Sequence, residues 1–192
     1  MKSKDTDTAR RRLKLRVAAK LMIYVGFAGV LYVFFAAFRS GDGKIPSLPG
    51  MRVSIAHIQP GEADFFSWEG RPVVVYRRLQ TDASMLRSDD KRLLDASSMN
   101  SEQPESSINA WRSETPEWFV ALALGTDLGC SIALLPASNE LFQGQVWSGG
   151  FVDSCRKARY DLAGRVYKSQ YAERNLIVPR YGIVDDTLIL GR

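Results

Sequence analysis

The residues of this chain best suited to chemistry are its two cysteines, Cys130 and Cys155, and its single histidine, His57. Thiolates and imidazoles are the soft and borderline donors that transition metals and iron–sulfur clusters take from proteins. The cysteines do not form a C-x-x-C pair, so nothing indicates a lowered thiol pKa. The chain also has no G-x-S-x-G sequence and no glycine-rich phosphate loop. We therefore expect no catalytic residue and no enzymatic activity of the chain itself.

Each cysteine lies in a short segment with a recognisable sequence. The first segment reads Gly125-Thr126-Asp127-Leu128-Gly129-Cys130, and the second reads Asp153-Ser154-Cys155-Arg156 and continues to Asp161. They resemble the two cluster-binding loops of the Rieske iron–sulfur subunit of ubiquinol–cytochrome c reductase, which read C-T-H-L-G-C and C-P-C-H-G-S. The resemblance continues over residues 70–78, 159–167 and 175–179, and it covers most of the chain.

The resemblance also implies what each position would do. Each loop of the family supplies one cysteine and one histidine ligand, and the matching positions of this chain are Gly125, Asp127, Asp153 and Arg156. The second cysteine of each loop is kept, and the family uses that pair as a disulfide. The resemblance therefore implies a disulfide between Cys130 and Cys155, although a redox-active thiol pair is an alternative.

The donor inventory argues against a cluster in this chain. A Rieske centre needs two thiolates on one iron and two imidazoles on the other, but the whole chain has two cysteines and one histidine. Arg156 stays protonated and would place a positive charge where iron should lie. We therefore expect no [2Fe–2S] cluster, no other metal and no cofactor. An ion pair of Arg156 with Asp127 or Asp153 would fill the space that the cluster occupies in the family. A site for a hard cation, built from the two aspartates, is a weak alternative.

Groups that surround the cluster in the family are altered in the same way. A serine that donates to the cluster corresponds to Ala158, whereas the tyrosine that does so is retained as Tyr160. The proline-rich loop that covers the cluster corresponds to residues 169–173, where both prolines are missing. Because these groups are lost together with the ligands, the sequence favours loss of cluster binding over a move of the ligands to other positions.

The N-terminal part of the chain predicts a membrane anchor. Residues 1–20 form a basic cytoplasmic tail with eight basic and two acidic residues, so the rest of the chain is close to neutral despite a net charge of +5. This distribution argues against nucleic-acid binding, which needs a basic face on the folded domain. Residues 21–38 carry no charge, and as a helix they would span roughly 27 Å. A cleaved signal peptide is the alternative, but the segment is long and ends in a poor cleavage site.

The position of the basic residues predicts the orientation. They lie before the span, so the N-terminus is expected in the cytoplasm of a bacterium and the C-terminal domain in the periplasm, with the anchor in the inner membrane. Residues 9–14 also resemble a twin-arginine export signal. The periplasm is oxidising and suits a disulfide.

The remaining chain divides into a hinge or linker over residues 39–50 and a head domain over residues 51–192. The head is predicted to be mainly β, a Rieske-like antiparallel domain tethered to the one transmembrane helix. Strands are expected over residues 52–56, 63–68, 73–78, 118–124, 131–136, 149–152, 159–166, 176–184 and 187–190. Residues 79–117 are polar and read mostly as a surface excursion, with a partner-binding insert as the alternative. A short helix is expected within them over residues 83–94, with Asp82 as its N-cap, followed by an exposed loop over 97–107.

These observations favour a non-catalytic, cluster-free accessory subunit of a bacterial respiratory membrane complex. The expected partners are the lipid bilayer and the membrane subunits of a cytochrome bc complex or of an associated terminal oxidase, with cytochrome b-type and c-type subunits among them. One alternative is an electron-transfer subunit that uses its disulfide or an unexpected metal centre. Another is an assembly or regulatory factor that mimics a true Rieske head.

Overall fold

The computed structural model describes residues 3–39, 50–86, 90–142 and 147–191. The chain divides into two units, Met1–Pro46 and Ser47–Arg192, and each is described by itself. The linker expected over residues 39–50 falls almost entirely outside the described residues.

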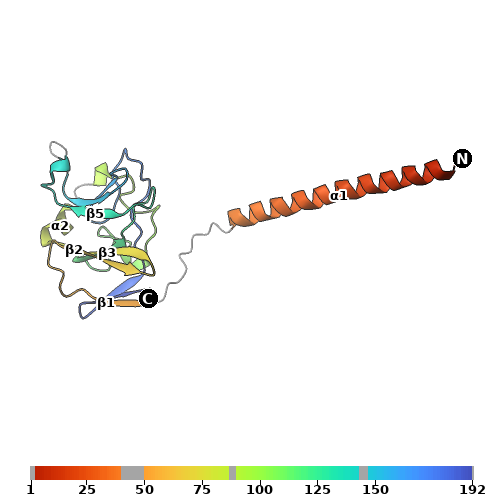
Figure 1. Ribbon diagram of the computed structural model, residues 1–192. Coiled ribbons are helices and arrows are strands. Elements are labelled where there is room, and N and C mark those ends of the chain that lie inside the picture. Colours follow the sequence, from red (N-terminus) through yellow and green to blue (C-terminus); the bar gives the residue numbers. More distant parts are fainter. Residues whose placement is uncertain (1–2, 40–49, 87–89, 143–146, 192) are drawn as a thin grey trace. The chain divides into compact units, whose positions relative to one another are not determined.

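The described part of the first unit is one helix, α1 (Ser3–Arg39), drawn without interruption in Figure 1. It contains no proline, and its stretch Lys14–Phe35 is long and apolar enough to cross a membrane. At about 1.5 Å per residue this stretch exceeds the thickness of the hydrocarbon core of a bilayer. The helix begins at Ser3, so the basic segment and the apolar segment belong to the same element.

The head is mostly antiparallel β-structure, as predicted. Its described part contains three sheets of three strands, and in Figure 1 the β2–β3 pair lies between β1 and β5. The first sheet has the order β1 (Met51–Ser54), β9 (Thr187–Leu190), β8 (Tyr181–Val184). The second has the order β2 (Ala63–Trp68), β3 (Arg71–Arg77), β4 (Trp118–Leu122). The third has the order β5 (Ile132–Leu135), β6 (Gly150–Asp153), β7 (Arg159–Tyr160).

The second sheet supplies the centre of the core. Val73, Val74 and Val75 of β3 are fully buried, and every residue of β4 is buried. β-Branched residues suit such strands because their stiff side chains pack well on a pleated surface. Phe119 of β4 contacts Phe151 of β6, with ring centroids 5.6 Å apart. This contact joins the strand before the first cysteine loop to the strand before the second.

Three expected elements differ in the structure. The strand expected over residues 159–166 is only β7, which ends at Tyr160. The helix expected over residues 83–94 is instead α2 (Gln80–Met85), with Leu79 as its N-cap, and a 3₁₀ turn η1 (Asp90–Arg92) follows later. Asp82 is not the cap but lies inside the helix. Its carboxylate reaches back to accept the Leu79 N–H at 2.8 Å and the Tyr76 hydroxyl at 2.7 Å. The strand expected to begin at residue 176 begins only at Tyr181.

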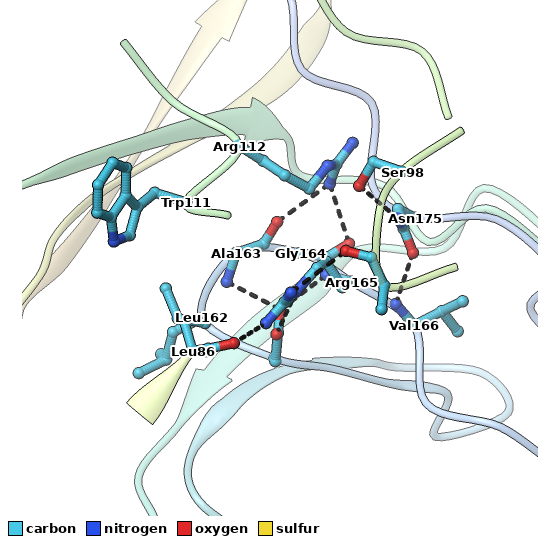
Figure 2. A network of polar contacts seen from close by, with 12 residues as sticks. Leu86, Ser98, Trp111, Arg112, Leu162, Ala163, Gly164, Arg165, Val166 and Asn175 are labelled. Atoms are coloured by element: carbon cyan, nitrogen blue, oxygen red, sulfur yellow. Dashed lines mark hydrogen bonds and ion pairs between the residues drawn. The ribbon is translucent and has the colours of Figure 1, made fainter. Parts of the chain in front are cut away.

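The polar segment 79–117 is not merely a surface excursion, which corrects the sequence-based expectation. Arg112 is fully buried and donates to the carbonyl oxygens of Ala163 at 3.0 Å, Gly164 at 3.2 Å and Leu176 at 2.7 Å. Figure 2 shows Arg112 pointing to the turn that contains Ala163, Gly164 and Arg165. The polar composition therefore reflects buried hydrogen bonding as well as exposure, because buried polar groups need partners.

Two further buried arginines complete this network. Arg78 donates to the carbonyl oxygens of Trp111 at 2.6 Å and Leu162 at 3.1 Å. Arg165 pairs with Asp161 at 2.8 Å and also donates to the Leu86 carbonyl. Burial lowers the pKa of Arg78 and of Arg112 to about 10. The network fixes the 161–166 turn, which follows directly after β7.

Candidate functional site: the tip loops

The two cysteine segments form adjacent loops, residues 125–130 and 153–158, which we call the tip. β4 leads into the first loop, and β6 ends at Asp153 as the second begins. β5 pairs with β6 so that Ile132 lies opposite Asp153. The Ser154 N–H donates to the Ser131 carbonyl at 2.9 Å. The sheet therefore brings together two loops that are distant in sequence.

A disulfide links the loops, as the resemblance implied. Cys130 and Cys155 are joined with their Cα atoms 6.0 Å apart, across a sequence separation of 25. Cys155 is exposed, and Cys130 is partly exposed. The disulfide ties together the two ends of this stretch in the unfolded chain and so lowers the conformational entropy of the unfolded state.

Replacing both cysteines by serine should lower the free energy of unfolding by about 3 kcal/mol, since the constraint on the unfolded chain is lost. Chemical denaturation of the full chain in detergent, compared with the oxidised wild type, measures this difference. The single Cys130→Ser and Cys155→Ser variants should each lose as much, because either one removes the whole bond. An unchanged transition midpoint in the double variant would refute the stabilising role.

The first and third ligand positions lie against each other. A Cβ atom added to Gly125 would come within 2.9 Å of the Asp153 Cβ and 3.2 Å of its Oδ2. Asp153 is buried, with 3% of its surface exposed. The space that a side chain at position 125 would need is therefore already filled by Asp153.

The buried carboxylate of Asp153 is used to form the second loop. Its Oδ1 accepts the backbone N–H groups of Cys155 at 2.9 Å and of Arg156 at 2.8 Å. Its own N–H donates to the Ala158 carbonyl at 3.0 Å, which closes the loop on itself. Asp153 therefore acts within the chain, as an acceptor for two amides.

The second and fourth ligand positions form an ion pair. Arg156 Nη1 lies 3.3 Å from Asp127 Oδ2, which confirms one of the two pairings expected from the sequence. The contact is electrostatic rather than a well-directed hydrogen bond, because the buried Oδ2 atom has no hydrogen-bond partner. The Arg156 guanidinium also lies over the ring of Tyr171, with Cζ 4.5 Å from the ring centroid.

Tyr171 was missed as a site residue in the sequence. It lies within residues 169–173, which correspond to the family's proline-rich covering loop. The available signal was an aromatic residue in the segment that covers the cluster loops in the family, because arginine stacks on aromatic faces. We call Asp127, Arg156 and Tyr171 the clasp.

The retained tyrosine, Tyr160, serves the first loop. Its hydroxyl oxygen accepts the Thr126 N–H at 3.0 Å and lies 3.2 Å from Thr126 Oγ1. Burial raises the pKa of Tyr160, so the hydroxyl stays neutral. Thr126 Oγ1 donates in turn to the Arg174 carbonyl at 2.6 Å.

The residues present at the tip do not fit a Rieske cluster. None of the four ligand positions carries a thiol or an imidazole, and both sulfurs are consumed in the disulfide. His57 pairs instead with Asp64 of β2, with Nε2 2.8 Å from Oδ2. Within the described ranges, no three His, Cys, Asp or Glu side chains are grouped to hold a metal ion. The carboxylates of Asp127 and Asp153 are engaged by Arg156 and by backbone amides, respectively.

Known proteins show where this chain belongs. No family model matches it. It is similar to the ubiquinol–cytochrome c reductase iron–sulfur subunit of Allochromatium vinosum, with 34% identity over 191 residues that cover 99% of this chain and 91% of that protein. It is also similar to a mitochondrial Rieske subunit of the cytochrome b-c1 complex of Nicotiana tabacum, with 29% identity over 88% of this chain and 58% of that protein. A chain of a hyperthermophilic respiratory Complex III structure matches with a TM-score of 0.44 and 15% identity, over 90% of this chain and 97% of that chain. The chain belongs to the family of Rieske iron–sulfur subunits of ubiquinol–cytochrome c reductase.

Proposed function

We propose that this chain is a cluster-free, non-catalytic accessory subunit of a bacterial respiratory membrane complex. The observation that carries the proposal is the closed tip, where Asp153 occupies the space beside Gly125 and Arg156 faces Asp127. Without thiolates or imidazoles at these positions, the head has no means of holding the centre that carries electrons in the family. Its contribution would then be structural or one of interaction.

The relatives support the proposed host, and the charge pattern supports the proposed orientation. The curated relatives are subunits of ubiquinol–cytochrome c reductase and of the cytochrome b-c1 complex. We place α1 in the inner membrane against cytochrome b-type, cytochrome c-type or terminal oxidase subunits, with the N-terminus in the cytoplasm and the head in the periplasm. The basic residues before the apolar stretch support this orientation. The disulfide supports an oxidising compartment.

Purification of the full chain from its native membranes in mild detergent tests the proposal. We expect b-type or c-type haem subunits, or oxidase subunits, to copurify at a fixed stoichiometry. Recovery of the chain alone would refute the accessory role, and substoichiometric, transient association would favour an assembly or regulatory factor.

Metal analysis and electron paramagnetic resonance on the same chain test the non-catalytic part. We expect no stoichiometric iron or acid-labile sulfide in the chain after it is separated from haem subunits. A Rieske-type signal would refute the proposal. Redox-dependent cycling of the Cys130–Cys155 bond during turnover of the complex would favour an electron-transfer subunit instead.

A further inference from the structure

Besides the backbone hydrogen bond from Ser154 to Ser131, three sets of contacts order the tip loops, and only one of them is covalent. The first is the Cys130–Cys155 disulfide. The second is the Asp153 carboxylate, which accepts two amides of the second loop and lies against Gly125 of the first. The third is the clasp, in which Arg156 of the second loop contacts Asp127 of the first loop and the Tyr171 ring.

The two hydrogen bonds that Asp153 accepts lie where hydrogen bonds are strong. The carboxylate is buried, and hydrogen bonds to a charged acceptor in a poorly solvated place contribute more than neutral ones. It also supplies an internal negative charge, so the amides of Cys155 and Arg156 need no external anion. The three side chains at the ligand positions are thus engaged within the tip, Asp153 by two backbone amides and Arg156 and Asp127 by each other.

We propose that Asp153 and the clasp keep the tip closed, and that neither a metal centre nor the disulfide is needed to hold the two loops in this arrangement. The disulfide then acts mainly by restricting the unfolded chain, whereas the loop conformation is determined by the carboxylate and the arginine stack. The inference concerns the tip alone and holds whichever complex contains the chain.

Hydrogen exchange of the full chain in detergent, followed at single residues, tests the proposal. In the Cys130→Ser/Cys155→Ser variant we expect the amides of residues 155 and 156 to remain protected within about threefold of the wild type under conditions where the head stays folded. Adding Asp153→Ala should then speed exchange at these two amides by about 10- to 100-fold, because two charge-assisted hydrogen bonds are lost. Fast exchange in the double serine variant with Asp153 intact would overturn the proposal.

A matched control is available elsewhere in the head. Asp95, which is partly buried, also accepts two backbone N–H groups, that of Met99 through Oδ1 at 2.9 Å and that of Asn100 through Oδ2 at 3.0 Å. Asp95→Ala should speed exchange at residues 99 and 100 and leave the tip amides unchanged. A loss of tip protection in this control as large as that in Asp153→Ala would show general destabilisation and would count against a local role.

The clasp is tested by two substitutions of Tyr171, one that keeps the aromatic ring and one that removes it. Tyr171→Phe keeps the ring under the guanidinium and should leave exchange at residue 156 unchanged, whereas Tyr171→Ala should speed it about three- to tenfold. If the Cys130→Ser/Cys155→Ser variant does not fold, the same exchange measurement is made on the Asp153→Ala variant with its disulfide intact. There, faster exchange at residues 155 and 156 supports the proposal, and unchanged exchange overturns it.

Discussion

Replacing Asp161 by alanine should lower the free energy of unfolding of the head by about 3–5 kcal/mol, the cost of leaving one member of a buried ion pair without its partner. Its side chain is 5% exposed, and that of Arg165, whose Nε lies 2.8 Å from Asp161 Oδ2, is 2% exposed. Asp161 Oδ1 also accepts the N–H groups of Ala163 at 2.9 Å and Arg165 at 2.8 Å. The substitution therefore removes a charge and two turn-forming hydrogen bonds together.

An exposed ion pair in the same domain provides the control. Arg77 and Glu117 also approach to 2.8 Å, but their side chains are 28% and 51% exposed. Glu117→Ala should cost less than about 1 kcal/mol, since solvent screens the pair. Denaturant unfolding of both variants in the full chain measures the contrast. Equal losses would mean that burial of Asp161 does not govern its contribution.

Most of the strands could be predicted because local sequence determines them, whereas the tip disulfide was implied by the resemblance to a family. The run Val73–Val75 and the apolar β4 form buried strands wherever a core is available. The loop sequences around Cys130 and Cys155 resemble a known pattern closely enough to pair the two cysteines. The lack of a fit for the cluster also followed from sequence, because a count of donor side chains does not depend on the fold.

The role of the polar segment could not be predicted, because it depends on contacts between distant residues. Arg112 donates to the Leu176 carbonyl, 64 residues away, and Arg78 donates to the Leu162 carbonyl, 84 residues away. A run of serine, aspartate and asparagine looks exposed when such partners are unknown. The position of Asp153 against Gly125 was hidden for the same reason, since it depends on how β4 and β6, strands of different sheets, pack against each other.

The network also explains how the tip can keep its shape. The three buried arginines fix residues 161–166, and Tyr160, immediately before them, binds Thr126 of the first loop. Arg112 of the polar segment therefore helps to hold the residues that follow β7, next to Tyr160, which contacts the tip. The tip is therefore stabilised both by the folded head next to it and by the contacts within the tip.

Gly150→Ala should prevent the head from folding. Gly150 begins β6 with a φ of 149°, a conformation that residues with a side chain rarely adopt. An added Cβ would overlap the Tyr160 carbonyl oxygen and would lie 3.1 Å from the Asp161 Cα. These are backbone atoms, held by the pairing of β6 with β7 and by the buried turn after it, so neither can move aside cheaply. The expected cost approaches the whole stability of a domain, about 5–15 kcal/mol.

The control Gly70→Ala shows how much of the loss of stability comes from the positive φ angle alone, without the steric overlap expected at Gly150. Gly70 has a φ of 77°, and nothing lies within 4 Å of an added Cβ, so only the backbone strain of about 1–2 kcal/mol is expected. Near-ultraviolet circular dichroism and limited proteolysis of the full chain in detergent should show a native head for Gly70→Ala and none for Gly150→Ala. A folded Gly150→Ala head would mean that β6 can move away from β7. Because Asp153 ends the same strand three residues later, such a movement would also carry its carboxylate away from Gly125 and open the tip.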